Sequence, residues 1–166
     1  MNGIHRIDTG LGPVQAAFDG EGAVVYLGFA DHEFRAALLA RVAGLGPVAV
    51  PPAAALRGLE AQLGAFAEGR LRTFDVPFRL HGTAFEQRVW AELQRIPFGE
   101  TRSYGQLAAA LGDRNLSRAV GRANGANPIS ILVPCHRVIG TNGALTGYAG
   151  GLAMKERLLR IEGAPV

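Results

Sequence analysis

The residues best suited to chemistry lie in one stretch, Asn127 to Gly140, which holds the chain's single cysteine, Cys135, followed directly by His136. A thiol beside an imidazole can be an activated nucleophile, because a nearby base raises the small fraction of thiolate present near neutral pH. Lone cysteines are more often inert apolar core residues. Here, however, Cys135, His136 and Arg137 interrupt an apolar run, and burying the last two unpaired would be costly. The pattern therefore favours a nucleophilic thiol at the end of a buried strand or in a tight turn.

Several spaced motifs accompany this thiol. Pro134-Cys135-His136-Arg137-Val138 follows Asn127-Pro128. The upstream motifs are Ser103-Tyr104-Gly105-Gln106-Leu107-Ala108 and Arg118-Ala119-Val120-Gly121, and the downstream ones are Leu145-Thr146-Gly147-Tyr148-Ala149-Gly150-Gly151, Lys155 and Glu162. In this order they resemble the alkylguanine-DNA alkyltransferases. The likeness is strong from residue 83 to residue 162 and loose over the first eighty residues.

The resemblance implies a reaction and its catalytic residues. Cys135 would take the alkyl group, and His136 would relay the thiol proton through water. Glu162 would orient and charge the imidazole, as in a catalytic triad. Asn127 matches a position that braces the active-site turn by side-chain hydrogen bonds, although an ordinary turn asparagine is an equal alternative. The product is a thioether, which water does not hydrolyse, so each molecule should act once, without a metal or organic cofactor.

The substrate implied is double-stranded DNA that contains 6-O-methylguanine or a larger 6-O-alkylguanine. The reacting carbon lies inside the base stack, so the nucleotide must be flipped out. Arg118 matches an arginine that fills the vacated space, and Tyr104 matches a tyrosine that helps to rotate the nucleotide and bonds to the base. Backbone groups of Cys135 and Val138 and the N–H of Ala149 match positions that read the guanine edge.

Length and composition limit the classes of protein to consider. The 166 residues suffice for one compact unit or two small subdomains with a real core. No apolar run approaches the length of a membrane span, and the N-terminus is not typical of a signal peptide. One cysteine excludes an internal disulfide and suits a reducing cytosol. We therefore expect a cytoplasmic monomer without membrane association.

The charge is divided unevenly along the chain. Residues 1–80 carry seven Arg against eight Asp and Glu, whereas residues 81–166 carry nine Arg and one Lys against six acids. The formal net charge of +3 is therefore the sum of −1 and +4. The positive half contains the cysteine, which suggests an anionic partner such as nucleic acid. The near-exclusive use of arginine is equally consistent with a composition bias.

Residues 1–80 are predicted to form an α/β structural subdomain. Two apolar runs flank Asp19-Gly20-Glu21-Gly22, which is typical of a β-hairpin. Helices are expected from about His32, capped by Asp31, to Val42 and from Ala53 to Glu68. Phe74, Val76 and Phe78 alternate as in a short strand. The resemblance implies a small ribonuclease-H-like antiparallel sheet with helices. His5, His32 and His81 lack metal-ligand spacing, so we predict no metal site.

Residues 81–166 are predicted to form a mainly helical DNA-binding and alkyl-transfer subdomain. Thr83 with Glu86, and Ser103 with Gln106, form capping boxes that begin two helices. A four-residue loop, 112–115, separates the second of these from another helix, and the pair reads as a helix-turn-helix. Arg118 and Arg122 lie four residues apart on its outer face, where a solvated charged face is the alternative to DNA binding.

Two further side chains of this half need partners or space. Trp90 is expected to pack beside the apolar stripe of the first helix, with base stacking as a lesser alternative. A last helix from Leu152 to Ile161 places Glu162 at its negative end. A carboxylate is unfavourable there when alone, so we expect it to have a cationic or hydrogen-bonding partner.

Three other functions use part of the same pattern. A hydrolase with a Cys-His-Glu triad would turn over repeatedly and would not need two arginines on an exposed helix. A non-enzymatic protein that binds alkylated DNA would lack the nucleophile, and Cys135 argues against it. A helix-turn-helix transcription regulator would bind a specific sequence and usually dimerise. The alkyltransferase accounts for most of the motifs.

Overall fold

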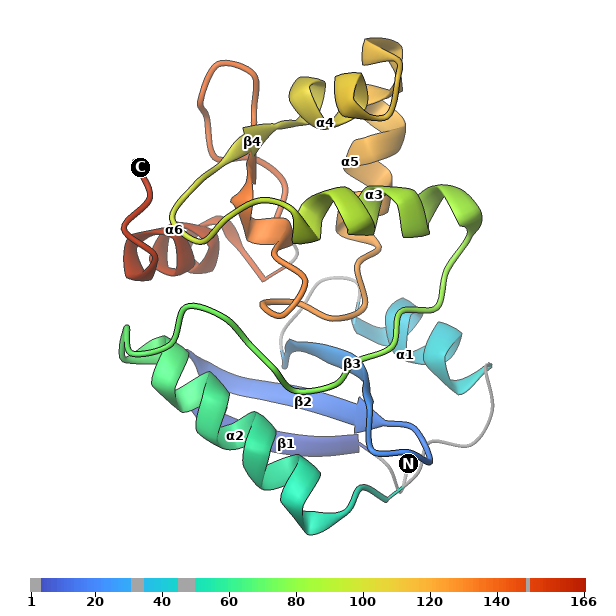
Figure 1. Ribbon diagram of the computed structural model, residues 1–166, viewed down its shortest axis with the longest axis vertical. Helices are drawn as coiled ribbons and strands as arrows, with labels where there is room; N and C mark the ends of the chain where they lie inside the picture. The colour runs from blue at the N-terminus through green and yellow to red at the C-terminus, as the bar shows by residue number, and fades with distance from the viewer. Residues whose placement is uncertain (1–3, 31–34, 45–49, 149) are drawn as a thin grey trace.

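The computed structural model describes residues 4–30, 35–44, 50–148 and 150–166, and its N-terminal half contains a three-stranded antiparallel sheet (Figure 1). The strands β1 (Ile4–Thr9), β2 (Gly12–Phe18) and β3 (Val24–Phe29) pair in chain order. The predicted hairpin is confirmed. The carboxylate of Asp19 accepts hydrogen bonds from the N–H groups of Glu21 and Ala23 at 2.9 and 3.0 Å, and Gly22 takes the positive φ of +82° that the turn requires.

Two helices accompany the sheet. Helix α2 (Ala53–Ala67) buries Leu59, Leu63 and Phe66 as predicted, while Leu56 is only half-buried. Helix α1 (Arg35–Ala43) lies beside β3 (Figure 1). The expected cap Asp31 and the first expected turn of this helix lie outside the described residues.

The predicted strand around Phe74 to Phe78 is wrong. The alternation is real, because Phe74, Val76 and Phe78 are half-buried and the residues between them are exposed. Yet this segment meets β3 at a single parallel bridge, between Val24 and Phe78. The remaining edge of β3 is occupied by residues 128–130, and Pro77 has no N–H to extend a ladder. The chain therefore passes this edge of β3 as an extended linker that leads to the C-terminal half (Figure 1).

The C-terminal half is mainly helical. Its elements, in order, are α3 (Ala84–Gln94), β4 (Arg102–Ser103), α4 (Tyr104–Ala110), the 3₁₀ turn η1 (Arg114–Leu116), α5 (Ser117–Gly125), the 3₁₀ turn η2 (Cys135–Arg137), β5 (Val138–Ile139) and α6 (Leu152–Ile161). Both predicted capping boxes are present, at the starts of α3 and α4. The predicted four-residue loop before α5 instead contains η1, which begins where the Asp113 side chain accepts from Asn115 N–H at 2.9 Å. No helix among the described residues is both long and apolar enough to cross a bilayer.

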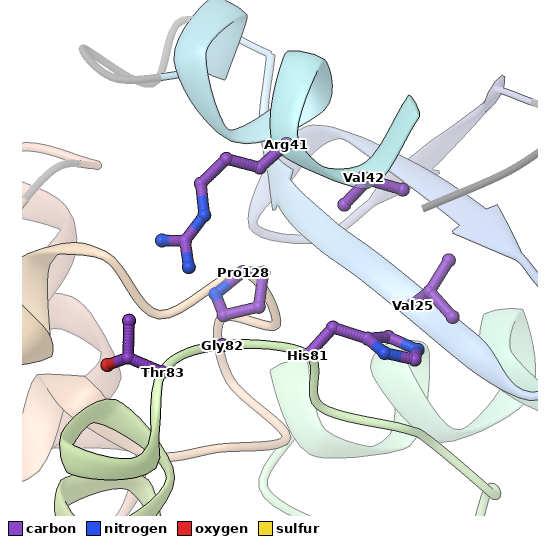
Figure 2. A pocket seen from close by; sticks show the side chains of 7 residues that line it. All are labelled: Val25, Arg41, Val42, His81, Gly82, Thr83 and Pro128. Atoms are coloured by element: carbon purple, nitrogen blue, oxygen red, sulfur yellow. The ribbon is translucent and has the colours of Figure 1, made fainter. Parts of the chain in front are cut away.

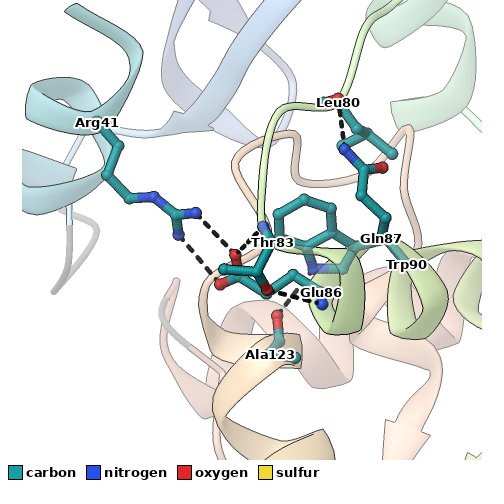
Figure 3. A network of polar contacts seen from close by, with 7 residues as sticks. All are labelled: Arg41, Leu80, Thr83, Glu86, Gln87, Trp90 and Ala123. Carbon is teal, nitrogen blue, oxygen red and sulfur yellow. Dashed lines mark hydrogen bonds and ion pairs between the residues drawn. The ribbon is translucent and has the colours of Figure 1, made fainter. Parts of the chain in front are cut away.

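Glu86 joins helices of the two halves, and Trp90 joins two helices of the C-terminal half (Figure 3). The Trp90 side chain is fully buried, which excludes base stacking, and its indole Nε1–H donates to the carbonyl of Ala123 in α5 at 2.8 Å. The Glu86 carboxylate caps α3 and also accepts two hydrogen bonds from Arg41 of α1, at 3.1 and 2.7 Å. A continuous apolar core extends from the sheet to these helices, so the N-terminal and C-terminal halves share one core.

Gly82 should be intolerant of a side chain because of Trp90. A Cβ at Gly82 would lie 2.4 Å from the buried Trp90 ring, whereas a Cβ at Gly64 in α2 meets nothing within 4 Å. We expect Gly82→Ala to lower the free energy of unfolding by about 1–3 kcal/mol through overpacking. Gly64→Ala should raise it by up to about 1 kcal/mol through helix propensity. Urea unfolding followed by the fluorescence of the single tryptophan measures both, and equal effects would contradict the packing.

Candidate active site

The segment that leads to Cys135 is a tight turn rather than a strand. It is held by the buried side chain of Asn127, which is 2% exposed. Asn127 Oδ1 accepts from the N–H of Ile129 at 3.0 Å, and its Nδ2 donates to the carbonyl of Val133 at 2.9 Å. One amide side chain thus closes both ends of the turn, which leaves the backbone of residues 129–133 with little freedom.

Ile131, inside this turn, adopts an unfavourable backbone conformation. Its φ is +73°, in the left-handed region that β-branched residues avoid, although it is buried to 2% exposure. Such a conformation costs about 1–3 kcal/mol and persists only where the surroundings impose it. The Asn127 hydrogen bonds and the apolar packing of Ile131 impose it here.

The same turn is attached to the N-terminal sheet. The N–H of Leu27 in β3 donates to the carbonyl of Pro128 at 2.9 Å, and the N–H of Ser130 donates back to Leu27 at 2.8 Å. The edge of β3 is therefore a fixed support for the segment that carries the cysteine. This contact explains why the N-terminal half matters to a site whose motifs all lie after residue 100.

Cys135 opens the turn η2 and is nearly buried, at 6% exposure. Burial raises the pKa of its thiol, while a hydrogen bond from Asn127 and the positive charge of Lys155 oppose that rise. The thiol and the adjacent imidazole of His136 are not hydrogen-bonded to one another within the described part of the chain. Adjacency in sequence therefore does not give direct contact.

His136, Arg137 and Glu162 form a buried charged cluster. His136 Nε2 lies 2.9 Å from Glu162 Oε2. Arg137 donates from Nε to Oε1 at 2.9 Å and from Nη2 to Oε2 at 2.7 Å, and its Nη1 donates to the carbonyl of Ile96 at 2.7 Å. The predicted need of Glu162 for a partner at the end of α6 is met by two side chains, His136 and Arg137. Burial alone would raise the pKa of Glu162, but these two partners lower it to about 2.

This cluster sets the tautomer of His136. An ionised carboxylate only accepts hydrogen bonds, so Nε2 carries the ring proton and Nδ1 keeps its lone pair. Nδ1 is buried and has no hydrogen-bond partner among the described residues. Burial lowers the pKa of His136, and Glu162 opposes that shift. The neutral imidazole is thus equipped as a base.

Arg137 was part of the motif but was given no role from sequence. The sequence did contain a signal for this pairing. A buried Arg137 needs an anion, and Glu162 at the end of α6 needs a cationic or hydrogen-bonding partner. Only the folded chain shows that one carboxylate serves both side chains, in a two-pronged geometry that suits a guanidinium.

A second set of side chains meets at the carbonyl of Thr146. The Tyr104 hydroxyl donates to it at 3.3 Å, and Lys155 Nζ donates at 2.6 Å. Burial raises the pKa of Tyr104 and lowers that of Lys155 to about 8, and both groups interact electrostatically with Cys135. The loop after β5 is therefore tied to α4 and α6 beside the thiol.

Arg118 and Arg122 project from the exposed face of α5. They border a groove of about 630 Å³ between α5 and α1. Gly121 and Gly125 line this groove and leave it open because they have no side chains. Tyr104 packs close to Gly121, so the exposed helix and the cysteine site adjoin. Val138 is fully buried in β5, which pairs with β4, and Ala149 lies outside the described residues.

A separate cleft of about 310 Å³ lies between β3, α1 and the linker, lined by Val25, Arg41, Val42, His81, Gly82, Thr83 and Pro128 (Figure 2). It contains none of the predicted site residues, and its guanidinium is already paired with Glu86. In the part of the chain that the structure describes, no group of three His, Cys, Asp or Glu side chains is arranged to hold a metal ion.

Comparisons with known proteins agree on one family. Residues 84–164 match the family model described as "6-O-methylguanine DNA methyltransferase, DNA binding domain". A methylated-DNA--protein-cysteine methyltransferase of Mycolicibacterium paratuberculosis is 56% identical over 108 residues, which are 65% of this chain and 66% of that relative. One of Mycobacterium tuberculosis is 54% identical over 112 residues, 68% of each chain.

Solved structures extend the likeness to nearly the whole chain. The M. tuberculosis OGT in complex with DNA has a TM-score of 0.81 at 43% identity, covering 96% of this chain and 93% of that one. The O6-methylguanine-DNA methyltransferase of Pyrococcus kodakaraensis has a TM-score of 0.63 at 29% identity, covering 97% and 98%. The N-terminal half, in which the motifs are weak, therefore shares the fold as well.

The Glu162 cluster should be visible as pH-dependent stability. The pKa of Glu162, about 2, lies below the ordinary value of 4.5. The ionised carboxylate therefore stabilises the fold fully above about pH 4.5, and this stabilisation is lost as the pH falls towards 2. Glu162→Gln should lower the free energy of unfolding at pH 7 by on the order of 3 kcal/mol, because it leaves the Arg137 charge buried without an anion.

The matched control is Glu156→Gln on the same helix. Glu156 pairs with Arg160 at 2.8 Å on the exposed surface, and its loss should cost no more than about 0.5 kcal/mol. Urea unfolding at several pH values should show the deficit of Glu162→Gln shrinking in acid. A deficit equal to that of the control, or independent of pH, would contradict the assignment.

Proposed function

The chain belongs to the methylated-DNA--protein-cysteine methyltransferase family, and we propose on that basis that Cys135 removes the alkyl group from 6-O-methylguanine or a larger 6-O-alkylguanine in double-stranded DNA. The observation that carries the proposal is the position of the single thiol. It lies on a braced turn beside a neutral imidazole whose tautomer is set by a buried carboxylate, next to an arginine-bearing helix.

The reaction needs no added reactant. The thiolate sulfur forms a bond to the alkyl carbon, the bond from that carbon to O6 breaks, and its electron pair stays on the guanine. The guanine takes up one proton, which balances the proton lost by the thiol. The product on Cys135 is a thioether without a carbonyl for water to attack, so the protein acts once and is consumed.

His136 is the base in this scheme. Its Nδ1 keeps a lone pair because Glu162 holds the proton on Nε2, and its lowered pKa keeps the ring neutral near pH 7. Because no direct bond joins the ring to the thiol, the proton passes between them through a water molecule. Asn127 holds the turn on which sulfur and ring are presented.

DNA is bound by α4 and α5 acting as a helix-turn-helix, with α5 facing the duplex. Arg118 enters the stack in place of the flipped nucleotide, and Arg122, one turn further along, contacts the phosphate backbone. The Tyr104 hydroxyl, near the thiol, helps to rotate the nucleotide and donates to the base. A donated hydrogen bond offsets the negative charge that develops on the departing guanine. Backbone groups of Cys135, Val138 and Ala149 read the guanine edge.

The division of labour along the chain follows from this site. Residues 1–80 form the structural subdomain and residues 81–166 the DNA-binding and alkyl-transfer subdomain. The protein acts as a monomer, since one chain supplies every group in the scheme. A nucleophilic thiol with no second cysteine suits a reducing cytoplasm.

Cys135→Ala tests the acceptor. The wild-type protein incubated with excess methylguanine duplex should gain one methyl group, confined to the Cys135 peptide by mass spectrometry, and then stop. Cys135→Ala should gain none while still binding the lesion duplex, because the turn is held by Asn127 and the sheet. Repeated turnover, or methylation elsewhere, would refute the proposal.

Arg118→Ala tests base flipping. The variant should react with the lesion in duplex at least about tenfold more slowly, yet react normally with free alkylguanine, which needs no extrusion. Arg114→Ala, which removes an exposed arginine of η1, is the matched control and should affect the two substrates little. An equal loss on duplex and free base would contradict the role of Arg118.

A further inference from the structure

Lysine occurs once in this chain, at position 155, whereas arginine occurs sixteen times. The Lys155 side chain is fully buried in α6. A bias towards arginine explains the abundance of arginine but not the single lysine kept at a buried position. Lysine differs from arginine in carrying a compact charge that responds to burial by shifting its pKa. Position 155 therefore has a requirement that a guanidinium does not meet.

Within the described part of the chain, the hydrogen bonding of Lys155 is incomplete. The ammonium has three N–H donors, and Nζ donates one to the carbonyl of Thr146 at 2.6 Å. Among the described residues no carboxylate forms an ion pair with it; the Glu162 oxygens are occupied by His136 and Arg137. A buried ammonium with one neutral partner is costly, so an anion is expected beside it.

Among the side chains that the structure describes around Lys155, one can supply that anion near neutral pH. The groups around this part of the site are Cys135 and His136 in η2, Tyr104 in α4, Tyr148 in the following loop and the already paired Glu162. Histidine ionises to a cation, and both tyrosines have pKa values raised by burial. Helix α6 packs against η2, and the charge of Lys155 acts on the Cys135 thiol.

We propose, on the basis of the function above, that Lys155 is the counter-ion of the Cys135 thiolate, a positioning residue that stabilises the sulfur anion before substrate arrives. The thiol proton leaves through His136, the ammonium keeps its own proton, and the sulfur electron pair stays available for the alkyl carbon. Once the thioether forms, Lys155 has no anion to face.

The electrostatics of the two groups are reciprocal. Burial raises the pKa of Cys135, and Lys155 opposes this; burial lowers the pKa of Lys155 to about 8, and Cys135 opposes that. A coupling free energy acts equally on both partners, so each should report the loss of the other. The ion pair exists between the pKa of the thiol and that of the amine.

The first test uses the protein without DNA, so its outcome is separate from that of the repair reaction. The rate of alkylation of the single cysteine by iodoacetamide is measured against pH. In Lys155→Met the rate constant at pH 7 should fall about tenfold and the pH profile should move up by about one unit. Lys155→Arg, which keeps the charge, should recover part of this shift, and the exposed Arg160→Met on the same helix should cause none.

The second test needs no variant and decides the matter if Lys155→Met fails to fold. Selective ¹³C labelling at Cε of lysine gives one NMR signal, whose titration reports Lys155 alone. Blocking Cys135 with iodoacetamide should lower the measured pKa of Lys155, because the anion is lost. An unchanged pKa after blocking, or an unmoved iodoacetamide profile in a folded Lys155→Met, would overturn the proposal and leave Lys155 as a clamp on Thr146.

Discussion

The site depends on one carboxylate, Glu162, that is shared by two neighbouring side chains. Glu162 lies at the C-terminus of α6, where the helix dipole disfavours a carboxylate. The guanidinium of Arg137 and the ring of His136 offset that cost. The same contact joins the C-terminus to η2 and selects the tautomer of the imidazole. The Glu162 charge that holds α6 against η2 is therefore also the charge that, in the proposed mechanism, prepares His136 to act as the base.

The second constraint is on the backbone that presents the sulfur. Asn127 closes the turn, β3 supplies a hydrogen-bonding edge, and Ile131 is held in a conformation that it would not choose alone. The free-energy cost of this strained turn is met when the protein folds, before substrate binds. The sulfur is therefore preorganised for the reaction. It also gives the N-terminal half a function, since that half carries no candidate chemistry of its own.

Burial acts oppositely on the acids and bases that meet here. It raises the pKa of the Cys135 thiol and lowers those of His136 and Lys155, so the neutral forms of all three are favoured. Burial alone would therefore keep the thiol protonated and less reactive. The hydrogen bond from Asn127 and the charge of Lys155 oppose that effect and favour the thiolate. The proposed single use of the protein makes such restraint advantageous.

The order of residues was sufficient to identify the nucleophile, the capping boxes, the hairpin and the arginine face of α5, because each rests on local spacing or on a motif of adjacent residues. It misplaced a strand at Phe74–Phe78 and gave no role to Arg137 or Lys155. Strand pairing depends on which distant segments share the edge of β3, and residues 128–130 take the part beside Leu27, so the segment at Phe78 pairs only at Val24. The contribution of a buried charge to stability and to the site depends on which opposite charge the fold places beside it, and that partner can lie far along the chain. The sequence alone determined which groups could react; the tertiary structure decided which of them meet, because contacts between distant residues and their burial are set only when the whole core has packed.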